Sequence, residues 1–324
     1  MLLLLLLMLI SSTGTGYRYR QYLRPRQERR TSFLYNYLDL GKVYTSTYEN
    51  TPWWPKTVDE MASDAAFCVK IALMSDISRV RVDVRLRLTN SERSMMEWII
   101  HLCKDLLETE VKESRLRVFM EDGATVQLAS TTLCRLFEKD PKMLKLLKKR
   151  VIFNVISQVD DFSPHDSLFI VVNPNNIMSS NPASSLLEDV QAICFHGALR
   201  NIPTIMTNPS LIATAWNDYG AKSPLLLSDF AQAYFICDDL FMMSSHDQFI
   251  GLVQRPNSGV DLFLLHGLYR GICAPKKYER IESFPDGMPD SLRSSLAHHL
   301  ATKDPHFPLY DVMNAENKEQ YEKN

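Results

Sequence analysis

Amide and carboxylate side chains follow three apolar stretches of this 324-residue chain, at Asp122, Asn173 and Asn208. Asn175 and Asn176 come shortly after Asn173 and complete the group. Amides both donate and accept hydrogen bonds, so these five residues are candidates for binding a polar ligand or a peptide backbone. Turn formation is the alternative, because Asn-Pro and Asp-Gly pairs are common signals of chain reversal.

Four arginines alternate with apolar residues between residues 79 and 88. They are Arg79, Arg81, Arg85 and Arg87. Successive side chains of a strand point to opposite faces, so the alternation predicts a strand with one buried face. The arginine face could bind phosphate, an acidic partner or anionic lipid headgroups. The alternative is a solvated face whose aliphatic stems cover neighbouring acids.

A second basic group lies in residues 142–150, directly after the pair Asp140-Pro141. Aspartate followed by proline is typical of a helix cap and first turn, so a short helix is expected here. We expect the lysines and the arginine of this stretch to lie on the solvent-facing side of that helix. Contact with a membrane surface or an acidic partner is the alternative.

Sequence motifs of common enzymes are not found. The chain contains no phosphate-binding loop, dinucleotide fingerprint, nucleophile elbow or zinc-protease motif. Ser245, His246 and Asp247 are adjacent in sequence, which does not indicate a triad converging in space. His298 and His299, next to each other on a predicted helix, point to different faces. The sequence therefore predicts no catalytic residue, metal or cofactor, and it favours a protein that is not an enzyme.

Charge and cysteine spacing exclude two further classes. The net charge of -2 argues against a strongly basic nucleic-acid-binding protein, so no nucleic-acid partner is expected. The six cysteines have neither zinc-finger nor redox-pair spacing, and a chain of this length needs no disulfides to fold.

The elements that must position these residues alternate between strand and helix. Strands are expected at residues 79–88, 115–120, 151–157, 167–172 and 203–207, with amphipathic helices between them. Three later strands, at 234–237, 249–255 and 261–265, follow with little helix between them. The pattern predicts an α/β fold with a largely parallel sheet, helices on both faces and a partly antiparallel late region. The polar residues that follow parallel strands would then share one edge of the sheet.

A double tryptophan precedes this domain, within Pro52-Trp53-Trp54-Pro55. We expect it to plug the core of the domain, and the alternative is a knob that binds a partner. Directly after it, Thr57 and Glu60 have the spacing of a capping box and predict the start of a helix.

The first 38 residues are expected to be a targeting presequence. Seven of the first ten residues are leucine, a run too short to span a bilayer but typical of a signal peptide. Six arginines follow within residues 17–30, as in a transit peptide. The two-part arrangement predicts a plastid protein, and secretion is the alternative. Residues 39–56 are expected to form a linker, 57–284 one α/β domain, and 285–324 a C-terminal helix with a polar tail.

Four stretches together resemble a known family. They are RVRVDV after the opening helix, RLRVFMEDGA at 115–124, FIVVNP at 169–174 with IPTIMTNPSL at 202–211, and GLVQRP at 251–256. Over residues 52–284 their order is similar to that of the plastid and cyanobacterial family called domain of unknown function nineteen-ninety-five. This family includes Low Photosystem II Accumulation three-like proteins, and the same domain is fused to a plastid adenylate kinase.

The resemblance implies a non-catalytic binding protein of the chloroplast. Its partners would be thylakoid assembly factors or photosystem subunits, with peripheral membrane contact and no transmembrane helix in the mature protein. The family has no established catalytic residues, and its arginine-rich stretch is replaced here by residues 224–230. A small-molecule or nucleotide-binding α/β domain, with or without enzymatic activity, is the alternative that the residues themselves leave open.

Overall fold

A computed structural model describes most of the chain between residues 54 and 285. The described residues are 54–86, 92–107, 114–158, 162–176, 183–211, 225–242, 248–256, 259–266 and 277–285. The chain divides into two compact units, and every described residue belongs to the unit formed by residues 52–108 and 112–324. The expected presequence, Trp53, Arg87, residues 245–247 and the expected C-terminal helix after residue 285 lie outside the described residues.

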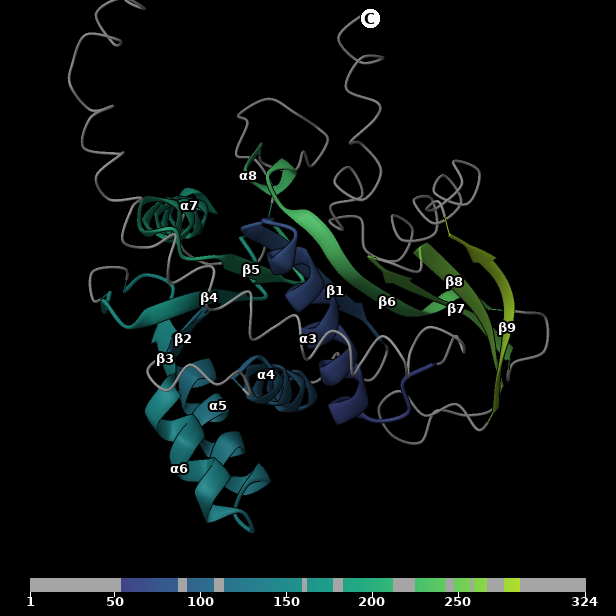
Figure 1. Cartoon of the computed structure of the whole chain (residues 1–324), viewed down its shortest axis with the longest axis horizontal. Helices are drawn as coiled ribbons and strands as arrows, with labels where there is room; N and C mark the ends of the chain where they lie inside the picture. The colour runs from purple at the N-terminus through teal and green to yellow at the C-terminus, as the bar shows by residue number, and fades with distance from the viewer. Residues whose placement is uncertain are drawn as a thin grey trace, which may run out of the picture. The chain divides into compact units, whose positions relative to one another are not determined.

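The described strands form one nine-stranded sheet in the order β3-β2-β4-β5-β1-β6-β7-β8-β9 (Figure 1). The strands from β3 to β6 are parallel, and those from β6 to β9 are antiparallel. Their bounds are β1 Arg79–Arg85, β2 Arg115–Met120, β3 Val151–Val155, β4 Asp166–Val172, β5 Thr204–Thr207, β6 Ala231–Met242, β7 Gln248–Arg255, β8 Gly259–His266 and β9 Lys277–Phe284. The predicted α/β fold with antiparallel late strands is confirmed.

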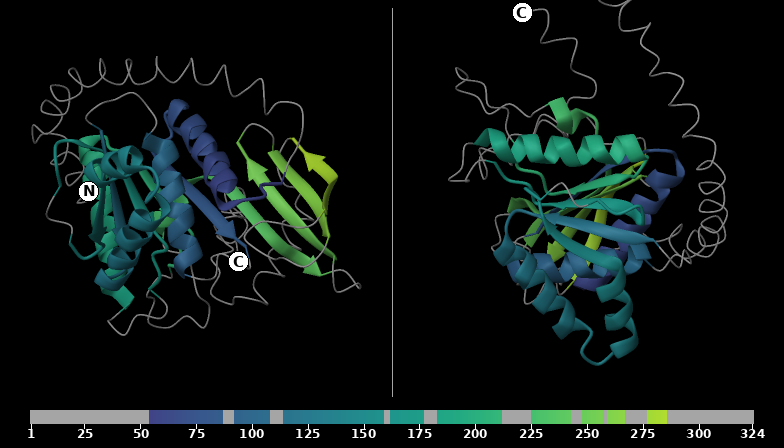
Figure 2. Two further views of the ribbon diagram at one scale, coloured as in Figure 1. Left: turned by 90° about the horizontal axis from the view of Figure 1, so that it is seen from below. Right: turned by 90° about the vertical axis from the view of Figure 1, so that its left-hand side faces the viewer.

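Helices cover both faces of the parallel strands, as predicted (Figures 1 and 2). The helices are α3 Val58–Met74, α4 Glu92–Leu107, α5 Gly123–Leu136, α6 Pro141–Arg150, α7 Ala183–Arg200 and α8 Leu225–Ser228. One hydrophobic cluster joins α3, α4 and α5 to the sheet, and a second joins α7 and α8 to the opposite face. Helices α5 and α6 project from the sheet as a hairpin (Figure 1). None of the described helices combines the length and the apolar character that a membrane span requires.

Two helices begin where the sequence predicts. The hydroxyl of Thr57 accepts a hydrogen bond from the Glu60 N–H at 3.1 Å, and the Glu60 carboxylate accepts one from the Lys56 N–H at 2.7 Å. At α6, the Asp140 carboxylate accepts from the Met143 N–H at 3.0 Å, and Pro141 occupies the first turn. These contacts satisfy N–H groups that a helix leaves without an intrahelical partner.

Trp54 plugs the core, as predicted. Its side chain is fully buried, and its ring meets that of Phe263 edge-on at 5.6 Å. The indole also lies directly over Gly251, where an added Cβ would come within 2.6 Å of the ring. Glycine at this position of β7 therefore makes room for the tryptophan.

The prediction that β1 has one buried face is wrong. Strand β1 lies between β5 and β6, and its five central residues are buried. The side chain of Arg81 is 2% exposed and that of Asp83 is fully buried. Their charges pair, with Arg81 Nε 2.6 Å from Asp83 Oδ2. The alternating pattern arose because one buried face is apolar and the other holds paired charges.

The antiparallel strands differ from the prediction in extent. Strand β6 is longer than the expected segment 234–237, and the sequence did not indicate β9, which pairs with β8. A buried ion pair ties this region to α3, since both oxygens of Asp64 accept hydrogen bonds from Arg255 of β7 at 2.7–3.0 Å.

Candidate functional site

The carboxyl ends of β2 and β4 form a topological switch point. The chain leaves β2 into α5 on one face of the sheet and leaves β4 toward α7 on the other (Figure 2). Neighbouring strands whose connections depart to opposite faces leave a crevice between them, where α/β proteins bind ligands. Asp122 directly follows the first of these strands and Asn173 the second. The structure therefore brings two of the predicted residues to adjacent strand ends.

A second switch point lies between β5 and β1, and Asn208 bridges it. The Asn208 side chain is 5% exposed, and its Oδ1 accepts a hydrogen bond from the Val84 N–H of β1 at 2.6 Å. Its amide nitrogen lies 3.7 Å from the sulfur of Met95 on α4. Asn208 is thus a structural link between two strands and a helix, and its amide oxygen is already occupied.

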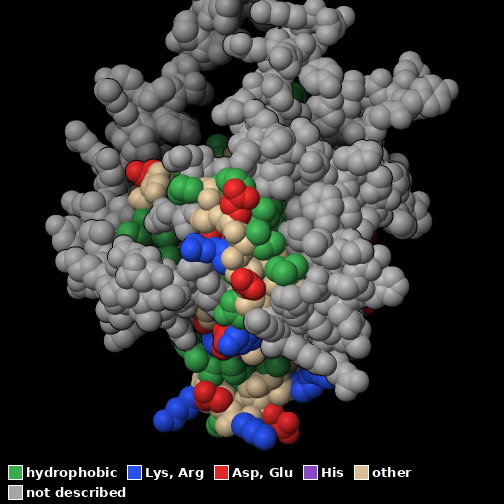
Figure 3. Space-filling view, turned by 90° about the vertical axis from the view of Figure 1, so that its right-hand side faces the viewer, with side chains coloured by type: hydrophobic (Ala, Val, Ile, Leu, Met, Phe, Trp, Pro, Cys, Tyr) green, Lys and Arg blue, Asp and Glu red, His purple; other side chains and the backbone are tan. Residues whose placement is uncertain are grey.

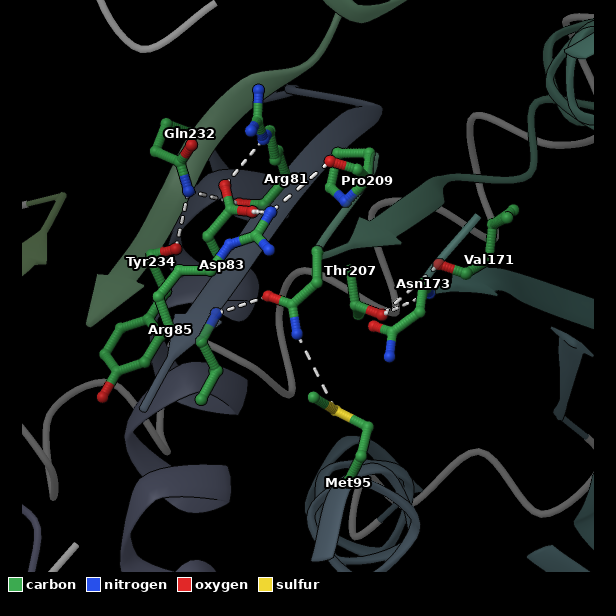
Figure 4. A network of polar contacts seen from close by, with 12 residues as sticks. Arg81, Asp83, Arg85, Met95, Val171, Asn173, Thr207, Pro209, Gln232 and Tyr234 are labelled. Atoms are coloured by element: carbon green, nitrogen blue, oxygen red, sulfur yellow. Dashed lines mark hydrogen bonds and ion pairs between the residues drawn. The ribbon is translucent and has the colours of Figure 1, made fainter. Parts of the chain in front are cut away.

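Asn173 has the same backbone conformation but a different side-chain environment. Its φ is 44°, against 43° for Asn208, and both values lie in the left-handed region that asparagine tolerates. The backbone N–H of Asn173 donates to the Thr207 carbonyl at 3.0 Å and also lies 3.4 Å from the Thr207 hydroxyl, the contact drawn in Figure 4. Its Oδ1, however, is buried without a hydrogen-bond partner in the described part of the chain.

The register explains this difference. Asn208 donates its N–H to the carbonyl of Val82, and its side chain accepts from the residue two positions later, Val84. Asn173 donates to the carbonyl of Thr207, so the corresponding donor would be residue 209. That residue is Pro209, which has no N–H. The role of Pro209 was not predicted from the sequence, although two Asn-Pro pairs at neighbouring strand ends were a visible signal.

Asp122 caps α5 at the first switch point. Its carboxylate accepts a hydrogen bond from the Thr125 N–H at 2.8 Å, and this bond lowers the pKa of Asp122. The pKa of the preceding Glu121 is raised, first by partial burial and then by the charge of Asp122. Glu121 was not singled out from the sequence because one acid before a cap carries no distinctive pattern.

The remaining asparagines extend the pairing of β4 and β5. Asn175 forms an isolated parallel bridge with Ser210, and the Asn176 N–H donates to the Ser210 carbonyl at 3.4 Å. The Asn176 side chain is 1% exposed. These two residues thus continue the pairing of the two strands beyond Asn173.

A family model described as "Domain of unknown function (DUF1995)" matches residues 55–237, more than half of the chain. The chain belongs to this family. No curated protein matches the chain. The DUF1995 match contains both switch points and helix α6, and it ends within β6.

The arginines of the DUF1995 domain that were predicted to face a partner lie in three environments. Arg79 pairs with Asp229, and Arg81 is buried against Asp83. Arg85 is partly exposed, 3.7 Å from Asp83 and 3.5 Å from the Pro209 carbonyl (Figure 4). Because Arg81 is buried, a partner surface could reach only Arg79 and Arg85 of the three described arginines. Arg87 lies outside the described residues.

Helix α6 presents a strongly basic exposed surface within the DUF1995 domain. Its four lysines are exposed, while Leu147 and Arg150 are buried. Arg150 donates to the Ser114 carbonyl at 2.8 Å, so its charge is directed into the protein. Among the described residues, no group of three or more His, Cys, Asp or Glu side chains could hold a metal ion.

Proposed function

We propose that this protein is a non-catalytic binding protein of the plastid that assists the assembly of photosystem II or another thylakoid complex. The observation that carries the proposal is the exposed lysine face of α6, since no lysine of this helix has an ion-pair partner in the described part of the chain. An exposed set of like charges without internal partners is suited to contact with an acidic surface. The family resemblance and the two-part presequence support the compartment.

Recovery of the protein from its own cells tests this proposal. The full chain with a C-terminal tag would be located by fractionation, captured in mild detergent, and its co-purifying proteins identified by mass spectrometry. We expect the protein in plastids, with thylakoid assembly factors or photosystem subunits enriched at least fivefold over an untagged control. Recovery from the secretory pathway, or from plastids without such enrichment, would contradict the proposal.

A matched variant separates specific capture from background. Replacing Lys142, Lys145, Lys148 and Lys149 by glutamine leaves the buried side of α6 intact, because all four side chains are exposed. We expect this variant to reach the plastid and to lose most of the enrichment, because α6 would no longer hold the protein at the acidic thylakoid surface where these complexes lie. The corresponding arginine variant keeps the charge and should retain it.

One observation favours a second candidate function, the binding of a small polar molecule at the carboxyl ends of β4 and β5. A buried acceptor without a partner costs about 1–3 kcal/mol, and a ligand with a suitably placed N–H or O–H donor would remove that cost at Asn173.

A thermal-shift screen of polar metabolites and nucleotides tests the second candidate. A ligand at 100 times its Kd stabilises the folded protein by about 2.7 kcal/mol. Asn173→Ala should abolish the shift, whereas Asn208→Gly, which alters the bridged switch point, should leave it measurable. A screen without any hit, or a hit unaffected by Asn173→Ala, would remove this candidate.

A further inference from the structure

The exposed side of α6 consists almost entirely of lysine. Lys142, Lys145, Lys148 and Lys149 are exposed, and the helix contains no acidic residue. At 100° per residue these four side chains occupy a continuous arc of about 120° around the helix, and they extend about 10 Å along it. The nearest acid in sequence, Asp140, is engaged as the helix cap.

Apolar groups border this lysine face. Leu146 is 39% exposed. An open concavity of about 400 Å³ is lined by Pro141, Leu144 and the three lysines Lys145, Lys148 and Lys149. The face therefore combines positive charge with short stretches of aliphatic surface, as a surface that receives charged headgroups would.

The turn between α5 and α6 has a different character. It carries Glu138, Lys139 and Asp140, all exposed. In Figure 3 the lower end of the molecule accordingly shows acidic and basic side chains side by side. The uniformly positive surface is confined to the outer side of α6 and does not include the tip of the hairpin.

We propose that the lysine face of α6 binds the surface of a membrane that contains anionic lipids. Protein interfaces are enriched in arginine and aromatic residues and depleted in lysine, and this face has four lysines and no aromatic residue. Lysine provides a compact point charge without fixed geometry, which matches a fluid array of headgroups better than a defined protein epitope. The apolar side of α6 packs against the domain, so the contact is electrostatic and peripheral.

The inference deepens the proposed function, on which it rests, by naming the partner of α6 as lipid. Each lysine near an anionic surface strengthens membrane partitioning about fivefold. Partitioning should also weaken with salt, because charges beyond a Debye length of about 8–10 Å are screened at 0.1–0.15 M ionic strength.

Vesicle binding of the full chain tests the inference. Vesicles of 30% phosphatidylglycerol in phosphatidylcholine would be compared with pure phosphatidylcholine by co-sedimentation. The four-residue glutamine variant Lys142→Gln, Lys145→Gln, Lys148→Gln and Lys149→Gln should partition at least 50-fold more weakly, and the matched arginine variant like the original chain. The arginines of residues 17–30 are present in every variant, so the comparison between variants isolates α6.

Lysine acetylation read by mass spectrometry locates the contact. Anionic vesicles should slow the acetylation of Lys142, Lys145 and Lys149 at least fivefold and leave exposed Lys56 unchanged. Equal labelling with and without vesicles, or equal partitioning of the glutamine and original chains, would overturn the inference. Protection by soluble polyglutamate but not by vesicles would overturn it too and assign the face to an acidic protein. In either case, capture of thylakoid complexes from cells would still stand as evidence for the assembly function.

Discussion

Strands β4 and β5 are both followed by an Asn-Pro pair, but the two asparagine side chains differ in their hydrogen bonding. Asn173-Pro174 ends β4 and Asn208-Pro209 ends β5, with φ values of 44° and 43° at the two asparagines. Each backbone N–H donates to a carbonyl of the next strand at 3.0 Å. Only Asn208 also has its side-chain oxygen paired, with the Val84 N–H.

The difference arises on the neighbouring strand, because the residue that faces Asn208 has an N–H and the residue that would face Asn173 is a proline. One turn sequence can therefore connect two strands or leave an acceptor available between them. Structure and ligand binding make opposite demands on such a group, since a stabilising amide must be paired and a binding amide must remain free.

We call the Asn208-Pro209 strand end the paired corner and the Asn173-Pro174 strand end the unpaired corner. The largest expected loss of stability is at the paired corner. Asn208→Ala leaves the buried Val84 N–H without an acceptor, which costs about 1–3 kcal/mol, and places alanine at positive φ, which costs about 1 kcal/mol. We expect the free energy of unfolding to fall by about 3 kcal/mol. Urea denaturation should show a lower midpoint with an unchanged m value.

Glycine separates the two contributions at residue 208. Asn208→Gly removes the backbone strain but still leaves Val84 unpaired, so a loss of about 2 kcal/mol is expected. A loss below about 0.5 kcal/mol in both variants would mean that the Asn208 amide does not connect the strands, and the comparison of the two corners would fail.

A smaller effect is expected at Asp122, the third strand end of this edge. Asp122→Ala removes the cap of α5 and should cost about 1 kcal/mol at neutral pH. Because hydrogen bonding lowers the pKa of Asp122 in the folded protein, its stabilisation is present above the pKa of the unfolded chain. The stabilisation is lost as the pH falls below about 4 and through the folded pKa.

Thermal unfolding from pH 7 to pH 2 measures this dependence. The difference between the original chain and Asp122→Ala should shrink on acidification, while Asp122→Asn, which caps without titrating, should match the original chain near pH 7 and become the more stable of the two near pH 2. A difference that stays constant across this range would show that the carboxylate charge plays no part in the cap.

Most of the fold could be predicted from the sequence because its signals are local. Periodicity located the parallel strands, and the side chains of Thr57 and Asp140 marked helix starts that depend on bonds within one turn. Strand β9 carries mostly exposed residues and pairs only at the sheet edge, so no buried face marked it in advance.

The environments of the candidate residues could not be predicted, since they depend on register between distant strands. Alternation correctly placed Arg81 and Asp83 on one face of β1, but only the position of β1 inside the sheet shows that this face is buried. Likewise, the pairing of Asn208 with Val84 spans 124 residues of sequence. A local pattern cannot distinguish this asparagine from Asn173.

The unpaired corner should not be destabilised by loss of its amide. Asn173→Ala removes a buried acceptor whose missing partner costs about 1–3 kcal/mol and adds the strain of positive φ, about 1 kcal/mol, so in urea denaturation we expect no loss or a gain of up to about 2 kcal/mol. Asn173→Gly avoids that strain and should raise the free energy of unfolding by about 1–3 kcal/mol. A loss of 2 kcal/mol or more in Asn173→Gly would show that the amide contributes to the fold and would withdraw Asn173 as a ligand acceptor.

The smallest effect is the most specific test of the register argument. Pro209→Ala introduces an N–H where the Asn173 oxygen lacks a donor, and a new hydrogen bond contributes about 0.5–1.5 kcal/mol. The loss of proline rigidity also affects stability, so the two changes must be combined in a double-mutant cycle, which isolates the coupling. We expect Asn173→Ala to cost about 0.5–1 kcal/mol more in the Pro209→Ala background than in the original chain. A coupling of zero would mean that the amide of Asn173 does not face residue 209, and that its acceptor is unpaired for a reason other than the proline.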